Sequence, residues 1–258
     1  MYGDLSVGTP RGAFRPSVIF LAIVALFVVA GAMLWQGLGH SGFNAFLFVV
    51  AGWLVSLCLH EYAHALTAYR GGDRGVAGRG YLTLNPLKYS HVLLSVILPV
   101  LFVILGGIGL PGGAVWVEKH RLRGKGWDSL VSFAGPLMNI LFALALVIPF
   151  AVGVDVLAHV DFWAAVAFLA FLQITASLLN LLPIPGIDGG NLIEPWLSPK
   201  WQRGFAMVAP YGMLLLFALL WQPGVGRIFF GVVFFLADLL GLPPALYAEG
   251  YDLFKFWS

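Results

Sequence analysis

The chain has 258 residues, of which 60% are hydrophobic and only 10% are charged, and its formal net charge at pH 7 is +2. Soluble domains are about a quarter charged, so this composition indicates a polytopic membrane protein. The small net charge and the lack of basic stripes exclude nucleic acid as a partner. The single cysteine excludes an intramolecular disulfide framework.

Seven apolar segments approach the length of about 20 residues that a membrane-spanning helix needs. They lie at about 17–36, 44–69, 91–110, 129–153, 161–182, 204–222 and 226–243. The first exceeds the apolar core of a typical secretory signal, so we expect it to be retained as an anchor. In the linker at 70–90, the stretch GRGYLTLN (Gly78–Asn85) favours a short β-hairpin, with an irregular loop as the alternative.

The distribution of Lys and Arg predicts the orientation, because cytoplasmic loops carry an excess of both. If every segment spanned, the 14 basic residues would divide evenly between the two faces. If 91–110 instead re-entered, all of them except Arg227 would lie on one side. Pro99 and the glycines after it suit such a broken element. We therefore expect an all-α protein with six membrane-spanning helices, one re-entrant segment and both termini in the cytoplasm.

A cluster of ionisable residues, HEYAH (His60–His64), lies within the apolar segment 44–69. Positions four apart share one face of a helix, so His60 and His64 can bind one metal ion. Glu61 lies beside that face, where it can take a proton from a metal-bound water. The alternative is polar residues bonded to neighbouring helices, but ionisable groups inside a membrane are costly and usually functional.

A catalytic zinc site needs a third protein ligand and one open position. Most other acidic residues fall in linkers or tails, and nothing near Asp238 in the last segment completes a site. Asp188 lies in NLLPIPGIDGGN (Asn180–Asn191), where prolines and glycines interrupt an apolar helix. Such a break is tolerated in a membrane only against protein or water, and an acidic group there can reach a metal. The alternative is an acidic turn residue at an ordinary helix end.

Three motifs carry a resemblance to a known family: HEYAH, SFAGPLMN (Ser132–Asn139) and NLLPIPGIDGG, in this order. Over about residues 44–192 the chain resembles the site-2 proteases, which are intramembrane zinc metalloproteases. The stretch GRGYLTLNPLKYSH (Gly78–His91) is similar to a linker in the compact branch of that family. The linker Trp116–Trp127 departs from that branch because it lacks prolines, and there is no PDZ or CBS domain.

The resemblance implies a single membrane-embedded domain over residues 1–258, with its catalytic core at about 44–192 and accessory helices at about 17–36 and 204–243. It implies that His60, His64 and Asp188 bind one zinc ion per chain and that Glu61 is the base that activates water. Asn180 resembles the family asparagine that holds the substrate strand or the developing oxyanion. Its alternative role is a capping amide near a helix end. The middle motif implies helix packing near the site.

The implied activity is hydrolysis of peptide bonds within or near transmembrane segments of a substrate protein. The implied location is the lipid bilayer of a bacterial-type inner membrane. One alternative is an inactive relative that binds membrane helices. A less favoured one is a metal transporter, which would need ligands along a path to both faces. The sequence does not predict an oligomeric state.

Overall fold

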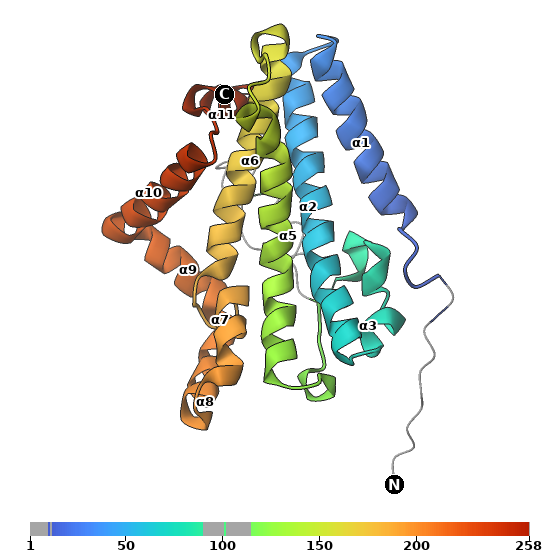
Figure 1. Ribbon diagram of the computed structural model, residues 1–258, viewed down its shortest axis with the longest axis vertical. Coiled ribbons are helices and arrows are strands. Elements are labelled where there is room, and N and C mark those ends of the chain that lie inside the picture. Colours follow the sequence, from blue (N-terminus) through green and yellow to red (C-terminus); the bar gives the residue numbers. More distant parts are fainter. Residues whose placement is uncertain (1–9, 11, 90–100, 102–114, 258) are drawn as a thin grey trace.

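Four long helices form the centre of the protein, for which the computed structural model describes residues 10, 12–89, 101 and 115–257. They run side by side in Figure 1, with α6 packed against both α2 and α5 and with α1 packed on α2. Their bounds are α1 (Val18–Trp35), α2 (Ser41–Gly71), α5 (Lys125–Ala151) and α6 (Val160–Leu181). These helices match four of the predicted apolar segments.

The remaining elements of the described residues are shorter and are also helical. The α-helices among them are α3 (Gly75–Gly78), α7 (Asp188–Ile193), α8 (Pro199–Val208), α9 (Gly212–Trp221), α10 (Pro223–Leu239) and α11 (Pro244–Phe254). Single 3₁₀ turns are η1 (Tyr81–Thr83), η2 (Pro86–Lys88), η4 (Lys119–Arg121), η5 (Leu157–His159), η6 (Glu194–Trp196) and η7 (Ala209–Tyr211).

Five described helical stretches are long and apolar enough to cross a membrane, namely those of the four long helices and the stretch Pro199–Trp221 that contains α8 and α9. The count is six if α10 and α11, bent by 116° at their junction, form one broken span. This confirms the prediction of an all-α polytopic membrane protein. The predicted re-entrant segment at 91–110 lies almost wholly outside the described residues. The most apolar stretch of α6 is 83% buried, whereas that of α1 is only 22% buried. α6 is therefore the central helix, and α1 lies at the periphery, where its apolar side chains suit contact with lipid.

The predicted β-hairpin at Gly78–Asn85 is wrong, because this stretch forms helical turns. Gly80 and Leu84 have φ values of 78° and 56°, and these left-handed residues turn the chain on both sides of η1. Tyr81 and Leu82 are buried in the same cluster as Ala65 of α2. Burial of these side chains against α2 therefore outweighs their preference for extended structure.

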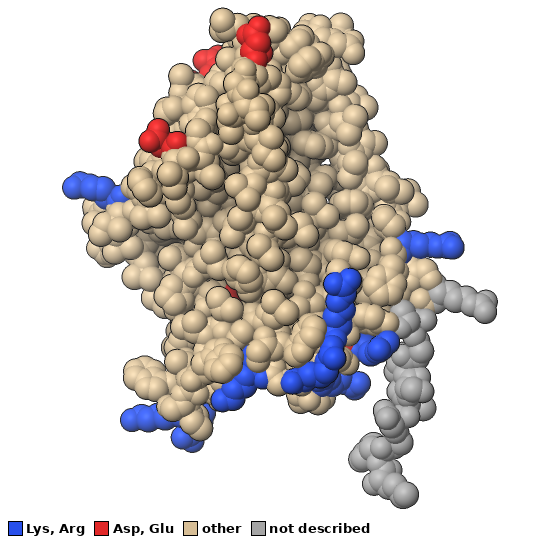
Figure 2. Space-filling model, in the orientation of Figure 1, with Lys and Arg blue, Asp and Glu red and all other residues tan. Residues whose placement is uncertain are grey.

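The two ends of the described chain lie at opposite ends of α2. Ser17, just before α1, donates a backbone hydrogen bond to Thr83, which lies beyond the C-terminal end of α2. Phe256, just after α11, stacks edge-on against Phe43 in the first turn of α2. The expectation that both termini are cytoplasmic stays a prediction. On the face shown in Figure 2, most Lys and Arg side chains gather toward the lower end, where α2 ends in Figure 1.

We expect Gly250→Ala to destabilise the protein, because α11 packs closely on α6. A Cβ atom at Gly250 would overlap the backbone carbonyl of Ala164, which cannot move aside as a side chain could. The expected loss is roughly 1–3 kcal/mol of unfolding free energy, read from thermal unfolding in detergent. Gly231→Ala in α10 is the matched control, because a Cβ there meets nothing within 4 Å. Equal stability of the two variants would contradict the packing described here.

Candidate metal centre

The HEYAH residues lie in the C-terminal half of α2 and are buried. His60, Glu61 and His64 are 3%, 1% and 7% exposed. The helix turns the two imidazoles toward each other, with their Nε2 atoms 3.0 Å apart. Nδ1 of His64 bonds the backbone carbonyl of Val131 at 2.6 Å, and Nδ1 of His60 bonds Oδ1 of Asn139 at 3.1 Å. Because both partners accept, each Nδ1 carries the hydrogen, and each Nε2 presents a lone pair to the site.

Helix α5 supplies the wall behind the two imidazoles. A Cβ atom at Gly135 would overlap Nε2 of both His60 and His64, so only glycine fits at this position. Pro136 lies within the helix next to it, and Asn139, one turn further on, reaches His60. The motif SFAGPLMN therefore forms the surface against which the histidines pack, as the sequence predicted.

Asp188 enters the site from a break between α6 and α7. α6 ends at Leu181 because Leu182, which precedes Pro183, has an extended conformation with ψ 137°. The loop then turns through Gly186, at φ 86°, and α7 begins at Asp188. The loop folds tightly, because a Cβ at either of the next two residues, Gly189 and Gly190, would overlap its backbone carbonyls. The carboxylate of Asp188 is thereby fixed next to the two histidines.

Three electron-pair donors meet at this point. Oδ2 of Asp188 lies 3.2 Å from Nε2 of His60 and 3.4 Å from Nε2 of His64. Ligands about 2.0–2.1 Å from a tetrahedral zinc ion lie roughly 3.3 Å apart, so these distances fit three corners of a zinc site. Three lone pairs this close repel one another unless a cation lies among them. The donor set therefore fits zinc.

Glu61 lies beside this triangle of atoms. Its Oε1 is 3.9 Å from Nε2 of His60, farther than either histidine nitrogen lies from Asp188. Glu61 also belongs to a buried cluster with His60 and His64 whose ligand atoms lie within 4.8 Å of one another. Asp188 completes the triangle more closely than Glu61 does, which leaves the Glu61 carboxylate next to the site.

Asn180, in the last turn of α6, is 4% exposed. Among the described residues, no side-chain hydrogen bond is seen for it. The structure thus brings His60, Glu61, His64 and Asp188 together and buries Asn180 eight positions before Asp188 in the chain. Sequence reasoning missed the bonds from Asn139 and Val131, because the spacing of a motif does not indicate which distant residue faces a histidine.

The chain is similar to three proteins that are named as zinc metalloproteases. The chain is 47% identical over 254 residues to "Putative zinc metalloprotease Rip2" of Mycolicibacterium smegmatis, covering 96% of each chain. It is 48% identical to the protein of the same name from Mycobacterium tuberculosis, again over 96% of each chain. It is 31% identical to "Putative zinc metalloprotease YwhC" of Bacillus subtilis, over 68% of this chain and 81% of that one. No family model and no solved structure matches the chain.

The chain is helical and suited to a membrane, it buries a histidine pair that could hold a metal, and its relatives are named as zinc metalloproteases. These findings together define a membrane zinc metalloprotease. The chain belongs to the site-2 protease family. Family membership argues against the metal transporter that the sequence left open.

We expect Gly135→Ala to weaken zinc binding, because the added methyl group would push the two imidazoles apart. The expected change is on the order of 10–100-fold in the zinc dissociation constant, measured by competition with a chromophoric chelator. Gly126→Ala is the control on the same helix, since a Cβ there meets nothing within 4 Å, and it should bind zinc like the wild type. Unchanged affinity in Gly135→Ala would mean that the imidazoles do not face α5.

Proposed function

We propose that this protein hydrolyses peptide bonds within or near the transmembrane segments of other proteins. The observation that carries the proposal is the meeting of His60, His64 and Asp188 beside the buried Glu61. His60, Glu61 and His64 lie on α2, a 31-residue helix of membrane-spanning character, and Asp188 reaches them from the start of α7, so the site is enclosed by apolar helices. A protease centre enclosed in this way is suited to a substrate that also lies in the membrane.

In the proposed mechanism His60, His64 and Asp188 hold the zinc ion through Nε2, Nε2 and Oδ2. Zinc, when bound, supplies a Lewis acid that polarises a carbonyl and makes water more acidic. Asn139 and Val131 hold the imidazoles in the tautomer that leaves each Nε2 free to bind metal. The chain itself therefore sets the ligand geometry before any substrate arrives.

Glu61 acts as the general base in this proposal. Its carboxylate accepts a proton from the attacking water and passes that proton to the amine that leaves when the peptide bond breaks. Its burial keeps bulk water away from the proton during these transfers. Asn180 donates its amide hydrogens to the substrate backbone or to the oxygen that gains charge in the transition state.

The substrate helix must unwind locally, because its own hydrogen bonds shield the scissile carbonyl. A helix with Gly, Pro or Asn near its cytoplasmic end unwinds most easily. We further propose that the end of the molecule rich in Lys and Arg is cytoplasmic, in a bacterial-type inner membrane, as the excess of positive charge inside favours. The site then opens toward the cytoplasm, the source of its water.

We expect zinc content to separate ligands from the base. Purified wild type and Glu61→Gln should each carry about one zinc per chain, by elemental analysis, whereas His64→Ala and Asp188→Ala should lose it. Asp238→Ala in α10 is the matched acidic control and should keep its zinc. Full zinc in Asp188→Ala would show that the third ligand is a different residue.

Cleavage should be tested on a designed single-span protein with an Asn-Pro-Gly break near the cytoplasmic end of its helix. Wild type should cut it, and should cut a companion with three Leu residues there much more slowly. Glu61→Gln should lose roughly 10²–10⁴-fold in kcat, the usual contribution of a general base. If the zinc-loaded wild type cuts neither protein while a known site-2 protease cuts the first, the chain is an inactive relative.

A further inference from the structure

A short segment without regular secondary structure, Val115–Glu118, precedes η4 and is called the strap below. It joins the end of the residues that are not described to η4. Val115 and Val117 pack against the apolar cluster that contains Ala65 and Ala68 of α2. The strap therefore lies along the half of α2 that carries the HEYAH residues.

The strap contacts Glu61 directly. The backbone N–H of Val115 donates a hydrogen bond to the Glu61 carboxylate. The other carboxylate oxygen, Oε2, has no partner among the described residues. In the part of the chain that the structure describes, the strap is thus the group that orients the carboxylate of the proposed base.

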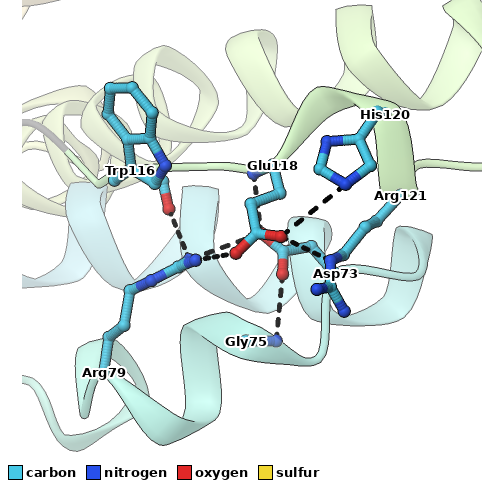
Figure 3. Close-up of polar contacts among 7 residues, drawn as sticks. All are labelled: Asp73, Gly75, Arg79, Trp116, Glu118, His120 and Arg121. Atoms are coloured by element: carbon cyan, nitrogen blue, oxygen red, sulfur yellow. Dashed lines mark hydrogen bonds and ion pairs between the residues drawn. The ribbon is translucent and has the colours of Figure 1, made fainter. Parts of the chain in front are cut away.

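Two residues of the linker after α2 hold the strap in place, as Figure 3 shows. Oδ2 of Asp73 accepts the backbone N–H of Glu118 at 2.8 Å, and Nη1 of Arg79 donates to the carbonyl of Trp116 at 2.9 Å. Arg79 also pairs with the Glu118 side chain and lies 3.6 Å from Asp73. The strap is therefore held through its backbone, which fixes its position along α2.

The side chain of Glu118 forms ion pairs with Arg79 and Arg121. Partial burial raises the pKa of Glu118, but the ion pairs with Arg121 and Arg79 outweigh it and hold the pKa below its usual range. Glu118 is therefore ionised at neutral pH. Beyond the strap, Lys119 lies 2.8 Å from Glu194 in η6, which follows the helix that begins with Asp188. The residue after the strap is thus tied to the turn that follows α7.

The carboxylate of Asp73 makes one local and one long-range hydrogen bond. Its Oδ1 accepts from the nearby N–H of Gly75 at 2.9 Å, a local bond that many aspartates make in turns. Its Oδ2 reaches Glu118, 45 residues away in the chain. The side chain is fully buried, at 0% exposure. The local turn requires only the bond to Gly75, so the buried bond to Glu118 is an additional, long-range interaction of Asp73.

We propose that Asp73 and Arg79 are positioning residues that orient Glu61 through the strap. The inference rests on the proposed role of Glu61 as the base. Asp73 fixes the N–H of Glu118, Arg79 fixes the carbonyl of Trp116, and the strap then presents the N–H of Val115 to the carboxylate. Loss of either residue should let the strap move and should misorient Glu61 while the zinc ligands stay in place.

The first test measures backbone hydrogen exchange in the zinc-loaded, full-length protein in detergent. In Asp73→Asn the amides of both Glu118 and Val115 should exchange at least about tenfold faster than in wild type, while those of residues 55–69 stay unchanged. Arg79→Gln, at a partly exposed side chain, is a second variant in case Asp73→Asn does not fold. Asp155→Asn is the matched control, because within the described ranges Asp155 accepts a local bond from the N–H of Leu157 and no long-range bond. Faster exchange at Glu118 alone, with Val115 unchanged, would overturn the proposal.

The second test separates positioning from stability by kinetics on the designed single-span substrate. Asp73→Asn, Arg79→Gln and Val115→Pro, which deletes the donor N–H, should each lower kcat about tenfold or more. KM should stay within about twofold and the zinc content should not change, and Asp155→Asn should behave as wild type. A loss confined to the yield or thermal stability of the variants, with normal kcat per zinc-loaded chain, would overturn the proposal. If the wild type cuts nothing, the proposed protease function fails, and the exchange rates alone decide whether Asp73 holds the strap.

Discussion

The structure depends on one unfavourable contact, the approach of three electron-pair donors to within 3.0–3.4 Å of one another in a buried site. Two imidazole nitrogens and a carboxylate oxygen at this distance repel one another unless a metal ion or a proton lies among them, so metal binding and folding are linked. Helix α5 and the loop before α7 hold these atoms together. α5 comes near enough because residue 135 is a glycine, and the loop before α7 brings in the carboxylate.

The enclosure of the site follows from helix packing rather than from a separate domain. α6 is the central helix, and it ends where Pro183 requires the preceding residue to leave the helical conformation. That ending is what allows the chain to turn back and present Asp188. The same apolar helices that bury the protein in lipid therefore also create the gap in which the polar atoms lie.

Local patterns predicted much of this structure, and long-range contacts could not be predicted. The spacing of His60 and His64 is a property of one helix, so their shared face follows from the sequence. The spans follow from hydropathy, and Asp188 from the chemistry that zinc requires. The bond from Asn139 to His60 joins residues 79 positions apart, and the bond from Asp73 to Glu118 spans 45. Nothing in the spacing of either pair indicates that the two residues meet.

The predicted hairpin at Gly78–Asn85 failed for the same reason. β-propensity describes how a side chain fits a pleated surface, and no described strand is available to pair with this stretch. Its aromatic and aliphatic residues pack against α2 instead. The side chains of Tyr81 and Leu82 are therefore buried from helical turns and not from a strand.

The closeness of the loop before α7 to the start of α9 limits how far the protein can be shortened. A Cβ at Gly186 would overlap the carbonyl of Ala209, and one at Gly212 would overlap the carbonyl of Pro185. At both points the backbone of the loop before α7 therefore packs directly against the backbone near the start of α9. This contact exists although the region 199–221 is only 11% buried over its most apolar stretch. A chain cut at residue 192 would keep every proposed ligand but would lose the surface that closes the Asp188 loop. The smallest autonomous unit is therefore larger than the stretch that contains the motifs.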